Sequence, residues 1–580
     1  MRLIILLFIF QFINLCNTIE YKSINPQDPL IGKIEKLVID KAKANSLKGI
    51  SVAIIESNKN LLLSGYGIGS QKNNLAINDT TNFKIGSISK VFTALLIMKL
   101  VETGKINLDK PIDTYIKEFS INKRYISNNP SIRQLLTHHG GMPSDIFNGF
   151  DFQNYIPPDY DRKFTEIPDL LKNEYSSEVP GKVSAYSNIS YGLLGLVIER
   201  VSGKKLNEYA NEILFTPLNM QSTSYLDQNS ENVSNGFLNG KEISAPKIRD
   251  LGAGSVSSNA KDMANLMKMF INLGKYEEIT VFKEITLIEM FKIQNKSALY
   301  DGDFEIGIPF WIDNYSSTST LYTHGGDLPP FHAQMILDIK NKTGITVMTN
   351  TLSSSLLMKE ISVDILKTLN PDLNLKKLVK NKIPSVADLH QAEGKYINSS
   401  SILEIKKKSS ELETNLGPLY LEGNTNNRFQ PLIRLLFGLI PIRIEALKSI
   451  EFSFKKSSEN KKYSTLYFNN MPVSTFIEYT LAIIHEEWKK RLGNYKIVTI
   501  DKNSSMNKIN LSIEDNLLVI QGDLKISNLE VPAKFLLRTS SEKLAFTEGM
   551  GRNSGLALQF IENSKGEYLL FYGFQFKKEN

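Results

Sequence analysis

The most informative segment of this chain reads Phe83-Lys84-Ile85-Gly86-Ser87-Ile88-Ser89-Lys90-Val91-Phe92-Thr93-Ala94-Leu95-Leu96. A serine hydroxyl is a weak nucleophile until a neighbouring base takes its proton. Residues three apart on a helix lie on the same face, so the Lys90 amine can reach the Ser87 hydroxyl. The segment predicts a helix that starts at Ser87 and ends near Gly104, a residue type favoured just after helices. Ser87 is therefore a candidate nucleophile.

The Ser-x-x-Lys spacing alone does not identify a site, because it occurs elsewhere in this chain. Further pairs are Ser258/Lys261, Ser458/Lys461, Ser505/Lys508 and Ser540/Lys543. The surrounding sequence must therefore single out one of them.

The composition is that of a globular protein with more than one domain. The chain has 580 residues, of which 42% are hydrophobic and 22% charged, so two or three domains are expected. The net charge of +7 is small for this length, and no basic block is interleaved with aromatic residues. Nucleic-acid binding is therefore not expected. The six histidines lack zinc-ligand spacing, so neither a metal nor another cofactor is expected.

Residues 1–18 predict a signal peptide. One positive charge at Arg2 precedes an apolar run that is too short for a typical membrane-spanning helix, and Cys16-Asn17-Thr18 follows. We expect cleavage after Thr18 and export to the periplasm or the extracellular space. Cys16 is the only cysteine. Its lipidation, with attachment to a membrane, is an alternative, although Leu15 is bulky for such a site.

Residues 25–372 alternate between strand and helix patterns. Strands are predicted at 50–56, 61–66, 331–339 and 344–350, and helices at 31–44, 190–202, 260–273 and 353–369. This order predicts an α/β (α+β) domain in which helices pack on an antiparallel sheet.

Residues 385–580 change to short alternating strands with Asn, Ser and Gly turns, which predicts a mainly β C-terminal region. Two of its segments are similar, Glu393-Gly394-Lys395-Tyr396 and Leu492-Gly493-Asn494-Tyr495. We interpret the region as two related units, about 390–480 and 490–580, or as one larger barrel. The apolar segment 432–442 is too short to span a bilayer, and we interpret it as buried, with a membrane or partner contact as the alternative.

A second candidate group precedes the helix predicted at 190–202. The segment Pro180-Gly181-Lys182-Val183-Ser184-Ala185-Tyr186-Ser187-Asn188 ends in a Tyr-x-Asn triplet. A tyrosine beside a lysine can pass a proton to a leaving group, and an asparagine can hold an amide through both hydrogen-bonding roles. The triplet recurs at Tyr396/Asn398 and Tyr467/Asn469, so the long context carries the prediction.

Two glycine-rich segments complete the set. In Thr323-His324-Gly325-Gly326-Asp327, paired glycines permit close approach to a sheet edge, where N–H groups can face a developing oxyanion. In Leu135-Leu136-Thr137-His138-His139-Gly140-Gly141-Met142-Pro143, we interpret the histidines as organising a loop rather than as catalytic. Lys342-Thr343-Gly344 is interpreted as an ordinary turn between two strands.

Taken in order, these segments resemble the serine β-lactamase-like hydrolases. The similar branch holds class C β-lactamases, penicillin-binding proteins, D-alanyl-D-alanine carboxypeptidases, D-aminopeptidases and esterases. Phe83–Lys90 matches the nucleophile motif and Tyr186-Ser187-Asn188 the Tyr-x-Asn motif, while His324-Gly325-Gly326 falls where the family has Lys-Thr-Gly or His-x-Gly. Leu135–Pro143 and Gly252–Met263 resemble two further family segments. The resemblance covers residues from about 30 to 370.

The resemblance implies covalent catalysis without a cofactor. Ser87 would attack an acyl carbon, and Lys90 and Tyr186 would share the base and acid duties. Asn188, His324, Gly325 and Gly326 would bind the substrate. The oxyanion would lie between the N–H of Ser87 and one just after Gly326.

The third motif departs from the ammonium-bearing pattern. His324 is largely neutral at pH 7, and Gly325 lacks a hydroxyl that would bind a carboxylate. Both features weaken the case for a penicillin or a terminal D-alanine carboxylate as substrate and favour an ester or a less anionic amide. Within the family, we expect an esterase or a D-amino-acid peptidase or carboxypeptidase type that acts on a small-molecule, peptide or cell-wall-derived substrate. A class C-like β-lactamase and a non-catalytic binding protein of the same fold are alternatives, and glycan or lipid binding by the C-terminal region is a third. The sequence leaves the oligomeric state open.

Overall fold

We analysed a computed structural model of the protein. It describes residues 28–146, 150–151, 164–226, 231–316, 319–353, 355–371, 373, 384–424, 428–435, 440–442, 444, 447, 450–468, 471–498, 506–526, 529–564, 566–572 and 574–579. The predicted signal peptide, Cys16 included, lies outside the described residues.

The N-terminal part is built on one antiparallel sheet of eight strands, in the order β12-β13-β14-β15-β16-β1-β2-β3. β1 pairs with β2 on one side and with β16 on the other, so the two ends of this domain meet at the centre of the sheet. The strands are β1 (Gly49–Glu56), β2 (Lys59–Ser70), β3 (Leu75–Ala76), β12 (Glu305–Ile306), β13 (Trp311–Ser316), β14 (Ser319–Leu328), β15 (Phe331–Asp338) and β16 (Thr343–Thr349).

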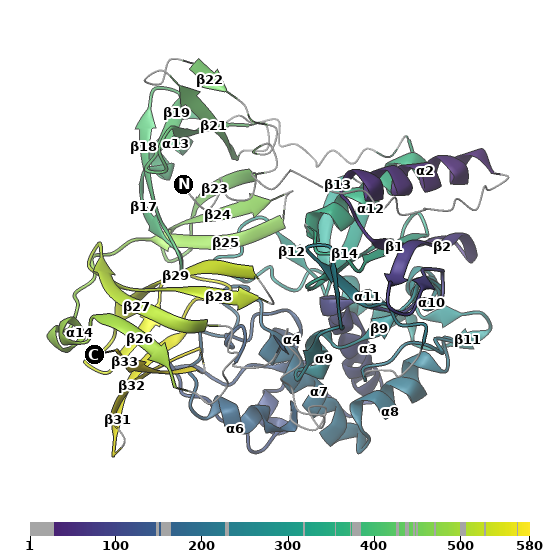
Figure 1. The fold of residues 1–580 in the computed structure, drawn as a ribbon, viewed down its shortest axis with the longest axis horizontal. Helices are drawn as coiled ribbons and strands as arrows, with labels where there is room; N and C mark the ends of the chain where they lie inside the picture. The colour runs from purple at the N-terminus through teal and green to yellow at the C-terminus, as the bar shows by residue number, and fades with distance from the viewer. Residues whose placement is uncertain are drawn as a thin grey trace.

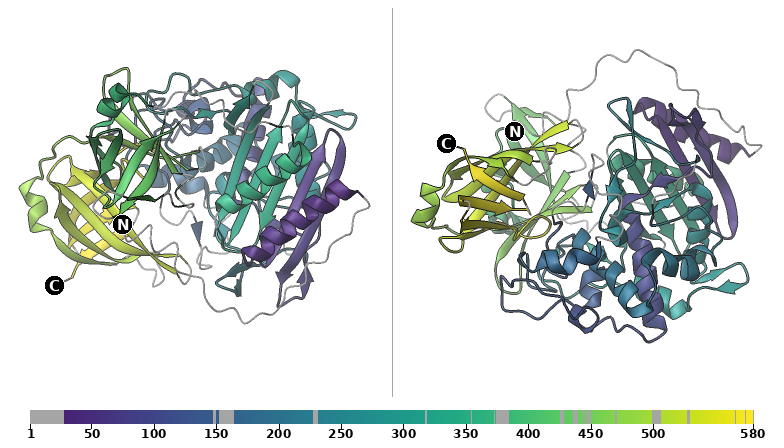
Figure 2. Two further views of the ribbon diagram at one scale, coloured as in Figure 1. Left: turned by 90° about the horizontal axis from the view of Figure 1, so that it is seen from above. Right: turned by 60° about the horizontal axis from the view of Figure 1, so that its bottom comes forward.

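Helices cover both faces of this sheet. Ile50, Val52 and Ile54 of β1 pack with α2 (Pro29–Ala44) and α12 (Ser355–Leu369), which lie across one face (Figure 2, left). The alternate residues Ala53 and Ile55 belong to the larger core on the opposite face, as expected for the two-residue period of a strand. The expected antiparallel sheet flanked by helices is confirmed.

The larger core is centred on α3 (Ser89–Glu102), which packs against α7 (Asn188–Ser202) and the short α9 (Leu251–Gly254). α3 is apolar around most of its circumference, as befits a helix buried on all sides. α10 (Ala260–Ile271) contacts β1 and β16 on this same side. Smaller helices of this domain are α4 (Ile132–Leu136), α6 (Ile167–Leu171), α8 (Leu206–Ala210) and α11 (Glu284–Phe291).

The C-terminal part contains two β units, each led by a short helix (Figure 1). In the first unit, the strand pairings run β17–β18–β19–β20–β21–β23–β24–β25 and return to β17, which closes an eight-membered ring with β22 attached to β21. The members are α13 (Val386–Ala392), β17 (Gly394–Ile397), β18 (Ile402–Lys408), β19 (Glu411–Thr414), β20 (Leu419–Gly423), β21 (Phe429–Leu435), β22 (Ile440–Ile442), β23 (Ile450–Lys456), β24 (Lys462–Phe468) and β25 (Met471–Glu478).

The second unit is a closed barrel of β26 to β33. Its members are α14 (Glu486–Lys490), β26 (Gly493–Ile497), β27 (Met506–Glu514), β28 (Leu517–Ile526), β29 (Leu529–Thr539), β30 (Leu544–Thr547), β31 (Ala557–Asn563), β32 (Gly566–Phe571) and β33 (Phe574–Lys578). Buried Trp488 of α14 belongs to its core. We call the two units the first and second barrels.

The similar segments found in the sequence occupy the same place in the two barrels. Each follows the short helix and starts the first strand, and both glycines, Gly394 and Gly493, have positive φ angles of 155° and 133°. The Tyr396 hydroxyl donates to the carbonyl of Ala392 at 2.9 Å, and the Tyr495 hydroxyl to that of Arg491 at 2.6 Å. The shared geometry supports the interpretation that the two units are related.

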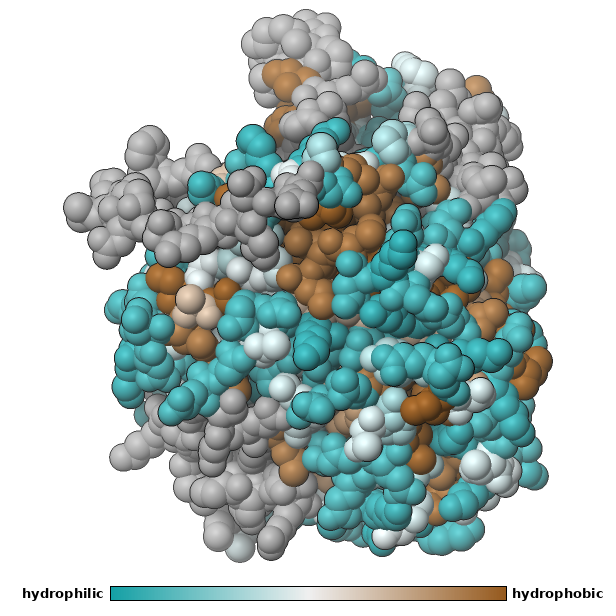
Figure 3. Space-filling view, turned by 90° about the vertical axis from the view of Figure 1, so that its right-hand side faces the viewer, coloured by the Kyte–Doolittle hydropathy of each residue, from teal (hydrophilic) through white to brown (hydrophobic). Residues whose placement is uncertain are grey.

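We call the N-terminal part, residues 28–373, the hydrolase-like domain after the family it resembles. Both barrels lie on one side of this domain, with the first barrel above the second in Figure 1. The apolar segment 432–442 contributes to β21 and β22 of the first barrel, and Leu432 is buried there, while residues 436–439 lie outside the described residues. The opposite side of the molecule is largely hydrophilic, with one large hydrophobic area and several smaller ones (Figure 3). Within the described chain, no helix is both long and apolar enough to cross a membrane.

Candidate active site

The candidate nucleophile lies in a tight turn between a strand and the central helix. β4 (Phe83–Lys84) pairs with β9 (Ser257–Ser258), and a 3-10 turn at Gly86–Ile88 then leads into α3. Gly86 has a φ of +51°, which favours glycine. The Ser89 hydroxyl fixes the conformation of the turn, because it donates to Gly86 O at 2.6 Å and accepts from Val256 N at 2.9 Å. Ser87 is thereby held at the N-terminal end of α3.

Lys90 is fully buried, and its amine lies against the Ser87 hydroxyl. Its Nζ is 3.2 Å from Ser87 Oγ and donates at 2.7 Å to both Asn188 Oδ1 and Ala253 O. Burial lowers the pKa of Lys90 well below the usual range of a lysine, while the carboxylate of Asp145 partly opposes the shift. Burial therefore favours the neutral amine.

Tyr186 lies beside Ser87 and Lys90, and its pKa is raised, whereas that of Lys90 is lowered. Lys90 Nζ lies 4.8 Å from the centre of the Tyr186 ring. Burial raises the pKa of Tyr186 to about 12, although Ser87 acts in the other direction. The phenol therefore carries its proton at neutral pH.

Asn188 starts α7 and links Lys90 to an acidic residue. Its Oδ1 accepts from Lys90, and its Nδ2 donates to Asp145 Oδ1 at 2.6 Å. These two contacts fix which end of the amide faces the lysine. Ser187 caps α7 by accepting from Ser190 N at 3.0 Å, so the helix start positions Asn188. Asn188 thus holds the amine of Lys90.

The third predicted segment lies on β14, next to the turn that carries Ser87. A Cβ on Gly326 would lie 1.9 Å from Ile85 O, and a Cβ on Gly86 would lie 2.8 Å from Asp327 N. Only glycines permit this approach. A Cβ on Gly325 would first meet Gln334 Oε1, at 3.4 Å, which is ordinary contact. The close packing brings the backbone N–H of Asp327 beside the nucleophile turn.

His324 is 2% exposed and neutral. Burial is the main cause that lowers its pKa to about 4. Its Nδ1 lies 2.7 Å from Gly325 O, which can only accept, so Nδ1 carries the proton and Nε2 is an acceptor. Among the described residues, His324 Nε2 has no hydrogen-bond partner.

The histidine pair on the 135–143 segment organises the loop that carries Tyr186. The carbonyls of His139 and His138 accept from Gly181 N and Ala185 N, both at 2.8 Å. His138 Nδ1 also accepts from Ser187 N at 3.1 Å. Buried His139 pairs through Nε2 with Asp301 at 2.8 Å. These contacts agree with the loop-organising interpretation.

Other expected features have separate places. Of Lys342-Thr343-Gly344, only Lys342 lies in the turn between β15 and β16, with a φ of +51°, while Thr343 and Gly344 begin β16. The Ser258/Lys261 spacing belongs to the start of α10, which Asn259 caps through Asp262 N at 2.9 Å. Among the described residues, no three His, Cys, Asp or Glu side chains form a group that could hold a metal ion.

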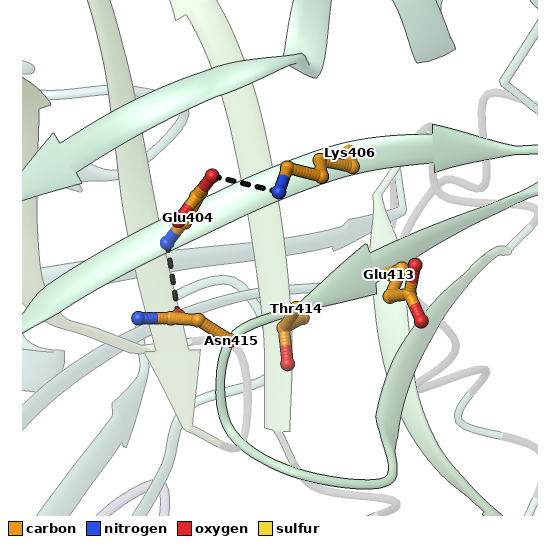
Figure 4. A pocket seen from close by; sticks show the side chains of 5 residues that line it. All are labelled: Glu404, Lys406, Glu413, Thr414 and Asn415. Carbon is orange, nitrogen blue, oxygen red and sulfur yellow. Dashed lines mark hydrogen bonds and ion pairs between the residues drawn. The ribbon is translucent and has the colours of Figure 1, made fainter.

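Two surface hollows also occur outside this cluster. One, of about 100 Å³, lies on β18 and β19 of the first barrel and is lined by Glu404, Lys406, Glu413, Thr414 and Asn415 (Figure 4). A larger hollow of about 750 Å³ lies on the hydrolase-like domain between residues 109–134 and 179–180. Its Pro180 belongs to the segment that leads to Tyr186.

Sequence reasoning missed three groups that the structure brings to the site. Ala253 contributes only its carbonyl, which side-chain motifs do not reveal. Asp145 lies just after the 135–143 segment, and its carboxylate accepts from Asn188 and from the Tyr572 hydroxyl, at 3.3 Å. Arg552 comes from the second barrel and lies over the Tyr186 ring, 5.4 Å from its centre. No motif in the β-rich region marks Tyr572 or Arg552.

Comparison with known proteins identifies the family. The family model described as Beta-lactamase matches residues 34–366, more than half of the chain. The chain therefore belongs to the β-lactamase family, and the family resemblance seen in the sequence is confirmed.

Two relatives illustrate how far the similarity extends. Protein flp of Staphylococcus aureus (strain N315) is 25% identical over 326 residues, which are 55% of this chain and 62% of flp. Beta-lactamase-like protein 4 of Dictyostelium discoideum is 29% identical over 403 residues, which are 62% of this chain and 68% of that protein. The match thus spans less than two thirds of the length of flp.

A solved structure shows a similar fold. The octameric penicillin-binding protein homologue from Pyrococcus abyssi superimposes with a TM-score of 0.51 and 22% sequence identity, over 77% of this chain and 100% of that chain. The likeness of fold therefore extends beyond the residues that the family model matches.

Proposed function

We propose that this protein is a serine hydrolase that cleaves an ester or amide bond through an acyl-enzyme on Ser87. The observation that carries the proposal is the hydrogen bonding of Lys90. A neutral amine has two N–H groups and one lone pair, and Asn188 Oδ1 and Ala253 O can only accept. They take both N–H groups at 2.7 Å, which leaves the lone pair for the Ser87 hydroxyl at 3.2 Å. Lys90 is thus arranged as a base for Ser87.

The pKa directions separate the base from the acid. Burial lowers the pKa of Lys90 and raises that of Tyr186 to about 12. Groups whose environments move their pKa values apart take the base and acid roles. In the proposed reaction, Ser87 Oγ attacks the acyl carbon while Lys90 takes its proton, and the Tyr186 hydroxyl then protonates the leaving group. The proton on Lys90 then returns to Tyr186. In the second step, water attacks the acyl carbon while Lys90 takes a proton from it, the bond to Ser87 Oγ breaks, and Lys90 returns the proton to Ser87 Oγ.

The backbone supplies stabilisation for the oxyanion in this proposal. Gly86 and Gly326 let β14 approach the turn that carries Ser87, and Asp327 N lies close to Gly86, the residue before Ser87. In this proposal, the N–H groups of Ser87 and Asp327 together face the oxyanion. Two such donors can stabilise the negative charge of the tetrahedral intermediate. The position of Ser87 at the start of α3 adds a favourable helix dipole.

The third motif by itself favours an ester or a less anionic amide over a penicillin or a terminal D-alanine carboxylate as substrate. His324 is neutral, because burial lowers its pKa to about 4, and Gly325 offers no hydroxyl. At this position the site therefore presents neither of the two groups that would hold the carboxylate of a penicillin. A class C-like β-lactamase is the alternative that this geometry disfavours.

Labelling with a fluorophosphonate, followed by intact-mass measurement, tests the proposal. We expect one adduct on the wild-type protein and none on Ser87→Ala. Absence of the wild-type adduct would favour the alternative of a non-catalytic binding protein. A substrate panel of short 4-nitrophenyl esters, D-amino-acid amides and nitrocefin then separates the subclasses, and nitrocefin turnover faster than ester turnover would overturn the esterase or peptidase assignment.

We further propose that the protein is exported. The support is the sequence of residues 1–18, with one positive charge, an apolar run and a small-residue exit. N-terminal sequencing of the protein expressed with its leader should find Ile19 as the first residue. A chain that begins at a lipid-modified Cys16 would instead indicate attachment to a membrane, and an intact Met1 would contradict export.

A further inference from the structure

The loop between β30 and β31 of the second barrel reaches the candidate active site. It comprises residues 548–556, and we call it the barrel loop. Thr547 closes its base: the Thr547 hydroxyl donates to Asn553 O at 2.7 Å and accepts from Leu556 N at 2.9 Å. The Asn553 N–H then donates to Ser144 Oγ of the hydrolase-like domain at 2.9 Å. The barrel loop is thus fixed at both its base and its tip.

Glycines seat the barrel loop between the other two parts of the molecule. Gly555 has a φ of +69°, and a Cβ there would lie 2.4 Å from Ser177 O of the hydrolase-like domain. Gly549 has a φ of +84°, and a Cβ there would lie 2.5 Å from Asn398 Cα of the first barrel. Met550 also bridges to Thr475 of the first barrel. Such close approach on two sides holds the loop in one place.

The barrel loop places Arg552 at the edge of the reacting groups. Its guanidinium lies 5.4 Å from the centre of the Tyr186 ring, and Nη2 lies 3.7 Å from Asp145 Oδ2. The side chain remains 53% exposed. Among the described residues, Asp145 is the only ion-pair partner of Arg552, and 3.7 Å exceeds hydrogen-bonding distance. Its N–H donors are therefore open to a ligand.

Arg552 supplies a permanent charge that the third motif lacks. The arginine guanidinium stays protonated at all ordinary pH values and matches the geometry of a carboxylate. His324, by contrast, is neutral. Asp145 is already engaged by Asn188 Nδ2 and the Tyr572 hydroxyl. The permanent positive charge of this site is therefore the Arg552 guanidinium beside Tyr186, and not a side chain of the third motif on β14.

We propose that Arg552 binds a carboxylate of the substrate and so makes the hydrolase selective for esters or amides that carry one near the scissile bond. This inference rests on the proposed function, since it names the substrate class of the same site. It also revises the interpretation drawn from the third motif alone, which favoured a less anionic substrate. The second barrel becomes part of the substrate site.

The test compares two 4-nitrophenyl esters of similar length, the glutarate monoester, which bears a carboxylate, and the neutral hexanoate. The readout is the ratio of kcat/KM for the anionic ester to that for the neutral ester. We expect Arg552→Gln to lower this ratio about tenfold, as for loss of one charge-assisted hydrogen-bonded contact at a half-exposed site. Arg552→Lys should restore part of the ratio, because it keeps the charge but loses the planar fork.

A matched control removes a positive charge of similar exposure from the second barrel unit. Lys489 on α14 is 51% exposed and pairs with Glu486, and Lys489→Gln should leave the ratio within twofold of the wild type. An unchanged ratio in Arg552→Gln would overturn the proposal. If kcat/KM then falls equally for both esters, Arg552 acts on Tyr186 rather than on the substrate.

Fluorophosphonate labelling distinguishes failure of this inference from failure of the proposed function. If the wild type is labelled at Ser87 but the ratio does not respond to Arg552→Gln, only the inference fails. If the wild type is neither labelled nor active on any ester, the proposed function fails and the inference with it. Thermal unfolding of each variant shows whether it is folded.

Discussion

Replacing Lys90 with methionine tests the role of the buried amine. Methionine keeps a long unbranched side chain but removes the group that faces Ser87. The amine is fully buried and donates to two acceptors at 2.7 Å, so the substitution changes both the chemistry and the hydrogen bonding of the site.

The expected loss of activity is large. A positioned general base contributes about 10²- to 10⁴-fold to a rate. We expect kcat/KM for a neutral 4-nitrophenyl ester to fall at least ~100-fold in Lys90→Met, which corresponds to about 2.7 kcal/mol of activation free energy. The rate of fluorophosphonate labelling should fall in parallel, because it depends on the same activated serine.

The expected loss of stability is smaller. Without the amine, Asn188 Oδ1 and Ala253 O lose their donors, and each unpaired buried acceptor costs about 1–3 kcal/mol. The variant also avoids the burial of an amine, which opposes folding in the wild type. Because these effects oppose each other, the free energy of unfolding should change by no more than about 2 kcal/mol. Urea denaturation measures it.

The pH profile provides a second readout. As the proposed base, Lys90 must be neutral, so kcat/KM of the wild type should rise with pH through the pKa of this residue. Because burial lowers that pKa, the plateau should be reached well below the pH at which a free lysine loses its proton. Lys90→Met should lack this acid limb.

Lys84 provides the matched control. It is 5% exposed, precedes the nucleophile turn and donates to Ser255 O at 2.9 Å. Lys84→Met therefore removes a buried lysine from the same region without removing the group beside Ser87. The reasoning is refuted if Lys90→Met keeps more than a tenth of wild-type activity, or if Lys84→Met loses as much activity as Lys90→Met.

Two further predictions concern backbone packing and a buried acid. Gly326→Ala should destabilise the fold by about 3 kcal/mol or more and abolish labelling of Ser87, because the added Cβ would meet Ile85 O at 1.9 Å. Gly325→Ala should unfold within about 2 °C of the wild type, because its Cβ would meet Gln334 Oε1 at 3.4 Å, an ordinary contact. Equal melting temperatures of the two variants would contradict the packing argument. Burial raises the pKa of Glu178 from 4.5 to about 7, so the unfolded chain holds fewer protons between these pH values and stability falls as the pH rises. Glu178→Gln removes this effect. In urea denaturation, the stability of the variant relative to the wild type should therefore rise by up to about 3 kcal/mol between pH 5 and pH 8. No rise would show that Glu178 ionises as freely in the fold as in water.

The regular elements could be predicted closely from the sequence. The helix predicted at 190–202 is α7 (Asn188–Ser202), and the strands predicted at 331–339 and 344–350 are β15 and β16. Apolar periodicity records which face of an element is buried, and glycines or capping residues mark its ends. These signals are local, so they survive in a single sequence.

The closeness of Ser87 and Lys90 could also be predicted from local sequence. They are three positions apart, and the 3-10 turn at Gly86–Ile88 together with the start of α3 places their side chains at one point. Tyr186 and His324 could be assigned only through their motifs and the family resemblance, because nothing in the spacing brings 186 or 324 to residue 87. The sheet and α7 do so.

By itself, the sequence determined the candidate nucleophile, its neighbouring lysine and the elements that carry them, because these depend on periodicity and short spacing. Only the tertiary structure decided the protonation of the site, since burial by distant segments lowers the pKa of Lys90 and raises that of Tyr186. It also brought in Asp145 and, from the second barrel, Arg552. Electrostatic environment follows from packing across the whole chain, and packing of that range leaves no local pattern in the sequence.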